Sequence, residues 1–212
     1  MMQLTYRDYA WIGIAGADGL VKVGNRGLLE GESMLERAWF KAGLREPYVG
    51  DIRDAILLQK YIKPSGDEPL RLIDVAAPIH DEFGVPVGVM GAHLSWEWAE
   101  RLRQELMASQ LASESVEIFV LSGDGVVLLG PDGWRDRPLE INAVREVRAS
   151  ASGFVRETWP DGQDYLTGFA RTQGRALFES LGWVVVVRMD ADVAFAPVLE
   201  LERQIWLASV GL

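Results

Sequence analysis

A repeated Asp-Gly turn constrains the fold of this chain more than any other feature of its sequence. Apolar residues flank the pair Asp18-Gly19, and apolar residues flank the pair Asp124-Gly125 in the same way. Asp-Gly between two apolar runs is a strong signal for a β-hairpin, because glycine adopts the positive φ that the turn requires. Two hairpins with matching flanks, each followed by a similar series of segments, predict a duplicated module.

Each predicted hairpin is followed by a helical segment and then by further strands. The first helix is expected at 33–43, with Ser33 as its N-cap and Glu36 as the capping-box partner, and the second is expected at 139–149. The remaining strands are expected at 70–78, 85–94, 153–159, 165–172 and 183–188. Each module is therefore predicted to be an antiparallel sheet with helices against it, which is an α+β fold.

Two longer helical segments follow the modules. Residues 95–112 are rich in Glu, Leu, Arg and Ala and contain no Gly or Pro, so they predict a helix that links the modules. Residues 190–207 predict a second helix, in which Pro197 causes either a kink or a late start. Residues 54–69 break the repeat and are interpreted as an insertion, whose first part could form a short helix. Insertions that cover a sheet often help to form a binding site.

Charge and composition exclude several classes of function. The net charge is -10 and basic residues form no cluster, whereas a nucleic-acid-binding protein needs a basic face that displaces counterions from phosphates. The absence of cysteine excludes thiol nucleophiles, disulfides and cysteine-based zinc sites, and His80 and His93 are too few for a histidine-rich metal centre. Neither Gly-x-Ser-x-Gly nor His-Glu-x-x-His is present. We therefore expect no nucleic-acid partner, no cofactor, no metal and no enzymatic activity in this chain.

The ends of the sequence bear on whether it is anchored in a membrane. Residues 1–10 contain no apolar core of a signal peptide, and no segment reaches the roughly 18 apolar residues of a spanning helix. Residues 205–212 are nevertheless apolar. They predict either a docked terminal helix or the first turns of a membrane span, with Arg203 and Trp206 at the interface. The lack of a helix stop signal favours the span.

Four segments carry a more specific pattern. They are 37–40 (Arg-Ala-Trp-Phe), 46–51 (Glu-Pro-Tyr-Val-Gly-Asp), 74–79 (Asp-Val-Ala-Ala-Pro-Ile) and 88–96 (Gly-Val-Met-Gly-Ala-His-Leu-Ser-Trp). In these segments and their spacing the chain resembles the double Cache family of sensor domains, also described as double PAS-like extracytoplasmic domains. The resemblance covers nearly the whole chain and implies a membrane-distal module followed by a degenerate membrane-proximal one.

The resemblance also implies a domain organisation and a role. The expected parts are the end of a stalk helix (1–10), the distal module with its linker helix (11–112), the proximal module (113–196) and a C-terminal helix leading to the membrane (197–212). The chain is then the periplasmic sensor of an inner-membrane receptor, which ends in a histidine kinase, a diguanylate cyclase or a chemoreceptor signalling region. Its partners are a small polar ligand and a second copy in a homodimeric receptor. A periplasmic protein–protein interaction module without a small ligand is the alternative.

A ligand site follows from the same resemblance. In the amino-acid-binding branch of the family, an Arg-x-Trp-Tyr helix holds the ligand carboxylate, and a further Tyr and an Asp hold its amine. Arg37, Trp39 and Tyr48 match this pattern. Phe40 replaces the tyrosine of the motif, and His93 stands where the amine-binding Asp is expected. A guanidinium can hold a carboxylate with two donors in one plane, and an indole N–H can add a third.

Two acidic residues complete the candidate site. The predicted ligand-binding residues are Arg37, Trp39, Phe40, Tyr48, Asp51, Asp74 and His93. Ordinary structural explanations exist for them, because Arg37 could pair with Glu36 or Asp51 and the aromatic rings could belong to the core. A buried Asp74 would need a partner, either Arg37 or a ligand. Because His93 supplies no formal anion, the site is expected to prefer a small organic acid without an α-amine, unless Asp51 or Asp74 takes over the amine contact.

Overall fold

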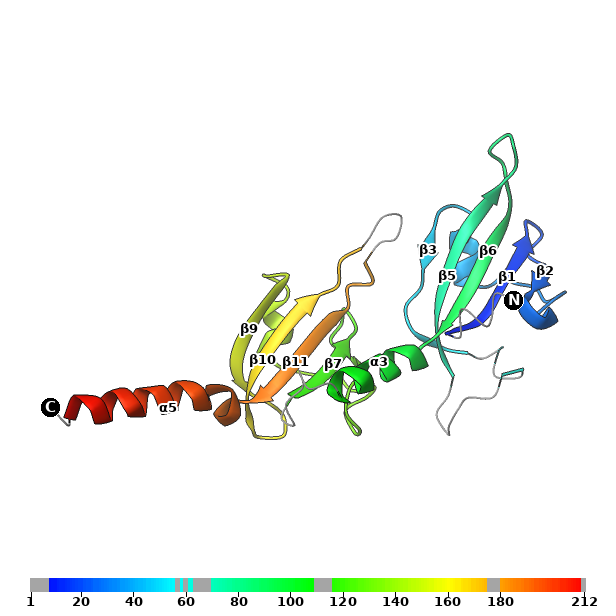
Figure 1. The fold of residues 1–212 in the computed structure, drawn as a ribbon. Helices are drawn as coiled ribbons and strands as arrows, with labels where there is room; N and C mark the ends of the chain where they lie inside the picture. The colour runs from blue at the N-terminus through cyan, green and yellow to red at the C-terminus, as the bar shows by residue number, and fades with distance from the viewer. Residues whose placement is uncertain are drawn as a thin grey trace. The chain divides into compact units, whose positions relative to one another are not determined.

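The computed structural model describes residues 8–55, 58, 61–62, 70–108, 116–174 and 180–210, the last segment without the side chains of 202–210. The chain divides into two compact units. The first is Met1–Arg101 with Gln173–Leu181, and the second is Leu102–Thr172 with Gly182–Leu212. We call these units the first and the second module and describe each by itself (Figure 1).

The first module is built on one antiparallel sheet. Its strands, in spatial order, are β2 (Val21–Gly24), β1 (Tyr9–Gly16), β6 (Pro86–Ser95), β5 (Arg71–His80) and β3 (Tyr48–Val49), and β4 (Arg53–Asp54) also pairs with β5. The helical elements are η1 (Asn25–Gly27) and α2 (Ala38–Gly43), and α3 (Glu97–Ala108) begins after β6 and ends in the second unit. The long strands β5 and β6 are joined by a tight turn and form the middle of the sheet with β1 (Figure 1).

Alternation along the strands gives this sheet one buried face. Successive side chains of a strand point to opposite faces, so every second residue faces the core. Trp11 of β1, Ala76 of β5 and Val89 of β6 lie on the buried face, and they pack in one cluster with Trp39 and Phe40 of α2. The six-residue helix α2 is thus held by two adjacent buried aromatic residues, because so short a helix has little stability of its own.

The second module repeats this plan. Its strands, in spatial order, are β8 (Val127–Leu129), β7 (Val116–Leu121), β11 (Val184–Asp190), β10 (Asp164–Arg171) and β9 (Ser152–Thr158). The helices are α4 (Asn142–Glu146) and α5 (Ala191–Val210). Phe119, Trp159, Phe169 and Val186 are buried together on one face of the sheet.

The predicted duplication is confirmed by topology and by register. The strand orders β2-β1-β6-β5-β3 and β8-β7-β11-β10-β9 correspond strand by strand. Gly19 and Gly125 both have positive φ, at 76° and 85°, as the hairpin turns require. Even the irregularity in each hairpin ladder recurs, between Ile14 and Ala15 in the first module and after Val120 in the second. The prediction of two related α+β modules is therefore correct.

The helix of the first module is shorter than predicted. It begins at Ala38 and not at Ser33, because the segment before the helix pairs with the hairpin, where Ser33 forms an isolated β-bridge with Leu20. The side chain of Glu36 accepts a hydrogen bond from Lys41 and does not cap a helix. The predicted capping box is therefore wrong. Backbone N–H and C=O groups that pair with a neighbouring strand are not available for the hydrogen bonds of a helix.

The corresponding helix of the second module is shortened for the same reason. Pro138 forms an isolated β-bridge with Val126, and the amide of Leu139 donates to the carbonyl of Gly125 at 2.9 Å. Helix α4 therefore begins only at Asn142, and the helix predicted over 139–149 is reduced to five residues.

The long helices are closer to expectation. Helix α5 begins at Ala191 and runs through Pro197, so a late start caused by the proline is wrong. Its start is fixed by Asp190, whose Oδ1 accepts hydrogen bonds from the amides of Asp192 and Val193. The predicted stalk helix at 1–10 lies mostly outside the described residues, and so does most of the insertion at 54–69. Within the described part of the chain, no helix has both the length and the apolar character needed to cross a bilayer.

The tryptophans packed on β6 require a glycine at Gly91. A Cβ at this position would lie 2.6 Å from a ring atom of Trp39 and 3.1 Å from one of Trp11. Gly91→Ala is expected to lower the free energy of unfolding by about 1–3 kcal/mol, the usual cost of overpacking a core. Gly168→Ala in β10 is the control, since its nearest atom would be 3.9 Å away. Urea unfolding followed by circular dichroism should show the loss for Gly91→Ala alone, and equal losses would contradict the prediction.

Candidate functional site

Two tryptophans enclose His93 in the core of the first module. The imidazole stacks on the indole of Trp11, with 4.9 Å between ring centroids and 26° between planes, and it meets Trp39 edge-on at 5.6 Å. All three side chains are almost completely buried. They converge because Trp11 and His93 are paired across β1 and β6 on the buried face, while Trp39 comes from the helix packed on that face.

Asp74 of β5 is the charged centre of the same site. It lies directly opposite His93 in the β5–β6 ladder, and Nδ1 of His93 is 2.6 Å from Oδ1 of Asp74. Arg53 of β4 donates from Nε to Oδ2 at 2.5 Å and from Nη2 to Oδ1 at 2.7 Å. The partner that a buried Asp74 requires is therefore Arg53 together with His93, and not Arg37.

The protonation states follow from these contacts. Burial alone would raise the pKa of Asp74, but the hydrogen bonds from His93 and Arg53 outweigh it and hold that pKa below its usual value. Burial lowers the pKa of His93, and the attraction of Asp74 only partly opposes this effect. The imidazole is thus neutral near pH 7. Its proton sits on Nδ1, which faces an ionised carboxylate, so Nε2 is left as an acceptor.

Arg37 stands at the wall of a small cavity beside this cluster. It is the N-cap residue of α2, with φ -83° and ψ 131°, and its side chain is half-buried. The cavity has a volume of about 10 Å³ and is lined by Leu29, Met34, Arg37, Trp39, Arg53, Ala55, Leu58, Leu72 and His93. That volume is room for about one water molecule. Among the described residues, the guanidinium of Arg37 has no hydrogen-bond or ion-pair partner.

The other candidate residues take different places. Phe40 is fully buried and meets Trp39 edge-on at 6.0 Å, so it contributes to the core. Tyr48 is half-buried on β3 and lies against Gly50, outside the cavity lining. Asp51 is exposed, and its Oδ1 accepts a hydrogen bond from the next amide in the chain. The structure therefore brings Arg37, Trp39, Asp74 and His93 together, but it does not bring Tyr48 or Asp51 to the cavity.

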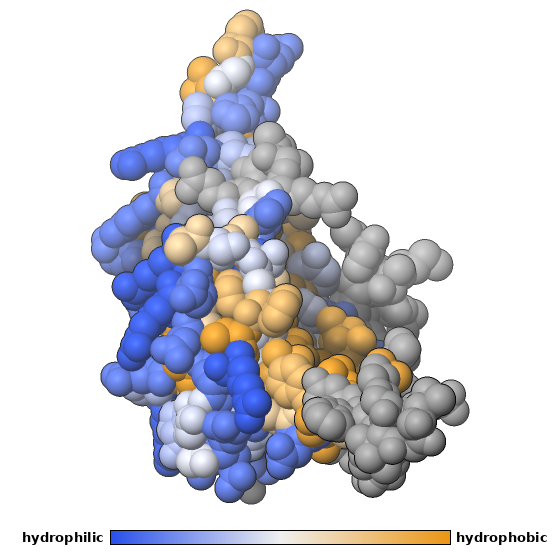
Figure 2. Space-filling view, turned by 90° about the vertical axis from the view of Figure 1, so that its left-hand side faces the viewer, coloured by the Kyte–Doolittle hydropathy of each residue, from blue (hydrophilic) through white to orange (hydrophobic). Residues whose placement is uncertain are grey.

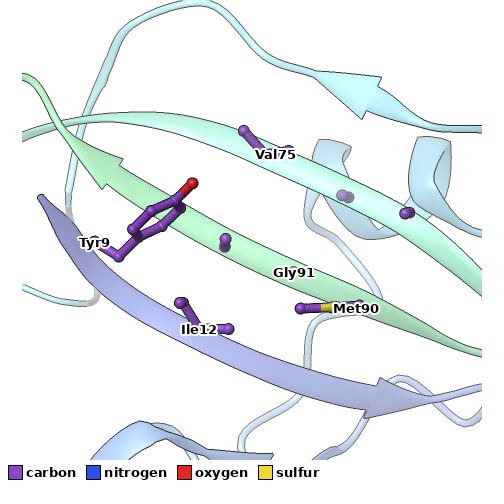
Figure 3. Close-up of a pocket in the computed structure, with 8 residues that line it drawn as sticks. Tyr9, Ile12, Val75, Met90 and Gly91 are labelled. Atoms are coloured by element: carbon purple, nitrogen blue, oxygen red, sulfur yellow. The ribbon is translucent and has the colours of Figure 1, made fainter. Parts of the chain in front are cut away.

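A larger hollow lies on the opposite face of the same sheet. Its volume is about 340 Å³, and it is lined by Tyr9, Ile12, Val75, Ala76, Ala77, Met90, Gly91 and Ala92. Figure 3 shows Tyr9 and Ile12 of β1, Val75 of β5 and Met90 of β6 around this hollow. The size falls within the range of ligand pockets, but none of the described residues that line it is charged.

Two residues of the site were not predicted from the sequence. Trp11 could have been found, since it precedes Gly13 and Ala15 on one face of an alternating strand. Arg53 could not, because its ion pair with Asp74 depends on the pairing of the two-residue strand β4 with β5.

The two histidines of the chain allow a controlled test of the buried pair. The pKa of His93 is lower in the folded protein than in the unfolded chain, where it is about 6.5. The unfolded chain therefore binds more protons as pH falls below about 6.5, and the first module loses stability in that range. The lowered pKa of Asp74 adds a second loss in stronger acid, below about pH 4.

His93→Asn is expected to flatten the pH dependence of stability between about pH 5 and pH 7. His80→Asn is the matched control, because His80 is exposed at the end of β5. Urea unfolding at a series of pH values measures both variants. The same slope in His93→Asn as in the unmodified protein would show that His93 is not held neutral by burial.

No protein-family model matches the sequence, and no curated protein matches it. Solved structures do match. The extracellular domain of rpHK1S-Z16, a protein assigned as a histidine kinase, has a TM-score of 0.63 at 15% identity over 92% of this chain and 76% of its own. The ligand-binding domain of the amino acid chemoreceptor PctC of Pseudomonas aeruginosa PAO1, in complex with GABA, has a TM-score of 0.62 at 18% identity, over 87% and 75%. The same domain of PctB from that organism, in complex with L-Arg, gives 0.56 at 20%, over 90% and 75%.

At these identities the likeness concerns the fold. It confirms the predicted architecture of two tandem PAS-like modules, each an antiparallel sheet flanked by helices. The chain has the fold of the extracellular and periplasmic sensory domains of histidine kinases and chemoreceptors.

Proposed function

We propose that this chain is an extracytoplasmic sensory domain that binds a small organic carboxylate in its first module and passes the signal to the cytoplasmic part of a membrane receptor. The observation that carries the proposal is the guanidinium of Arg37, which lies on the cavity wall beside Trp39 and His93 and has no partner among the residues that the structure describes. Similar folds support the sensory role, and GABA and L-Arg, the ligands of two of them, both contain a carboxylate. The receptor is expected to act as a homodimer.

The charges around the cavity favour an anion. Arg53 and Asp74 neutralise each other in a two-point ion pair, and His93 is neutral. Within the described residues, Arg37 therefore supplies a positive charge that no ion pair compensates. A carboxylate fits the planar donors of a guanidinium with two parallel hydrogen bonds, which are stronger than bonds between neutral groups.

The same contacts disfavour an α-amine in the ligand. Oδ1 of Asp74 already accepts from His93 and Arg53, and Oδ2 accepts from Arg53. An ammonium group would have to displace one of these donors, at the cost of a buried charge left unpaired. Asp51 is exposed and does not line the cavity. A small acid without an α-amine therefore matches the available groups better than an amino acid does.

Entry of such a ligand requires movement of the wall. A carboxylic acid of three or four carbons does not fit in a volume of about 10 Å³. Met34, Arg37 and Leu58 line the cavity from segments outside the strands, so they are the residues that can move without breaking the sheet. A ligand that binds only the opened arrangement shifts the equilibrium toward it, and this shift is the proposed signal.

A thermal-shift screen of the purified chain against paired small acids and their α-amino counterparts tests the proposal. A ligand at about one hundred times its dissociation constant adds roughly 2.7 kcal/mol of stability, which is easily seen. Arg37→Ala is expected to weaken the best ligand about 10- to 100-fold in calorimetric titration, since a charge-assisted hydrogen bond contributes about 1.5–3 kcal/mol. Arg45→Ala is the matched control, because Arg45 is exposed and lies outside the cavity lining.

Two results would overturn the proposal. Equal losses of affinity in Arg37→Ala and Arg45→Ala would remove Arg37 from the site. Tight binding of an α-amino acid that is lost in Asp74→Ala but kept in His93→Ala would show that Asp74 recognises an amine, against the preference for simple acids.

The apolar hollow favours a second candidate function, docking of a periplasmic protein. Figure 2 shows apolar surface among polar surface on the side of the molecule that it draws. On the first module's sheet, Met90 lines the hollow and is 45% exposed. The two functions are separated by variants in the full-length receptor. Met90→Glu should abolish signalling if a protein docks on this face, whereas Arg37→Ala should abolish it if a carboxylate binds in the cavity.

A further inference from the structure

The core of the second module contains an aromatic cage that is filled by a side chain of the same module. The guanidinium carbon of Arg188 lies 4.0 Å from the ring centroid of Tyr165, 4.2 Å from Trp159, 5.2 Å from Trp134 and 5.4 Å from Phe119. All four distances are within the roughly 6 Å at which a cation is attracted to the face of a ring. The side chain of Arg188 is 5% exposed, so this guanidinium is held almost without water.

Two carboxylates complete the cage. Nε of Arg188 donates to Oε2 of Glu117 at 2.6 Å, and Nη1 donates to Oδ2 of Asp161 at 2.8 Å. Asp161 is held in turn by the hydroxyl of Tyr165 at 3.2 Å and by the amide of Gln163 at 3.1 Å. The carboxylates lie on different elements, one on β7 and one in the turn between β9 and β10. The cage therefore has the aromatic walls and the anionic hydrogen-bond acceptors that a planar cation needs.

The rings of the cage are themselves fixed in place. The indole N–H of Trp159 donates to the hydroxyl of the fully buried Thr167 at 2.9 Å. Trp159 also contacts the other three rings, with centroids at 5.0 Å from Phe119, 5.6 Å from Trp134 and 5.7 Å from Tyr165. A set of rings held in this way keeps its shape when its occupant changes, which is the property of a binding site.

The strand registers identify Arg188 as the counterpart of His93. With the two Asp-Gly turns aligned, Trp11 of β1 corresponds to Glu117 of β7. Trp11 pairs with His93 in the β1–β6 ladder, and Glu117 pairs with Arg188 in the β7–β11 ladder. The position that faces the candidate ligand cavity in the first module therefore carries, in the second module, a guanidinium that fills the equivalent space.

We propose that Arg188 acts as an internal ligand of the second module, and that the cage it occupies is a binding site for a guanidinium cation. With Arg188 in place this cage is closed to solutes. Removing the side chain beyond Cβ leaves a cavity with aromatic walls and two carboxylates, and a free guanidinium or methylguanidinium ion matches it in charge, planarity and hydrogen bonding. This inference does not depend on the ligand of the first module.

The experiment is rescue of Arg188→Ala by a free cation. The variant is expected to melt at a lower temperature than the unmodified protein, because Glu117 and Asp161 lose their buried partner. Methylguanidinium at about 10 mM, far below denaturing concentrations, should restore a large part of the loss by binding the folded state. Calorimetric titration should show one binding site in Arg188→Ala and none in the unmodified protein.

Three controls separate a binding site from a general effect. Urea, which is planar but neutral, and sodium chloride at the same concentration should not restore the melting temperature of Arg188→Ala. Arg156→Ala should not respond to methylguanidinium, since Arg156 lies over Phe195 at 5.6 Å with an exposed side chain. Rescue of Arg188→Ala by urea, its failure to respond to any guanidinium, or one-site binding to the unmodified protein would overturn the proposal.

A measurement on the unmodified protein keeps the proposal testable if Arg188→Ala does not fold. The Nε–H resonance of Arg188, assigned by its loss in Arg188→Lys, should lie apart from those of the exposed arginines and should exchange slowly with water. A resonance at the position of the exposed arginines, with fast exchange, would show that the guanidinium is not held in the cage.

Discussion

A side chain able to carry positive charge stands at the centre of the buried face of each sheet, and the packing of both modules depends on how that charge is satisfied. In the first module the position holds His93, which is kept neutral and bonded to Asp74 between two tryptophans. In the second module it holds Arg188, whose guanidinium is bonded to two carboxylates and enclosed by four rings. A buried charge without such partners would cost more than either module can lose. The two cores therefore differ although the strand order is the same.

Features of the fold could be predicted from the sequence where they depend on residues close together in the chain, and not where they depend on distant ones. The hairpins at Gly19 and Gly125 were predictable because the turn depends on neighbouring residues and on a positive φ that glycine adopts freely. The helix starts were not predictable, because Ser33 forms a β-bridge with Leu20, a residue of the hairpin 13 positions earlier in the chain. The start of α5 was predictable in principle, since the cap formed by Asp190 is local and outweighs the proline seven residues further on.

The residues of the candidate site likewise fall into those that could be predicted from the sequence and those that could not. The motifs that resemble the double Cache family sufficed to nominate Arg37, Trp39 and His93, which the structure places around one small cavity. They did not suffice for Arg53, whose partnership with Asp74 exists only through the register of a two-residue strand. In the second module, the sequence contains a signal that marks Arg188. Arg188 has the same parity as Val184 and Val186 along β11, so it faces the core, and a charged residue at such a position must have partners.

The cap of α5 has a mechanical consequence. Asp190 is both the last residue of β11 and the residue whose carboxylate holds the first amides of the helix, and it pairs across the sheet with Tyr165. The helix therefore has no linker at its origin. Rotation of α5 about its axis would break the cap bonds, and a pull along the helix would load the central strand of the sheet directly. Because no flexible segment separates β11 from α5, a displacement of the strand moves the helix with it, and the two elements act as one rigid unit.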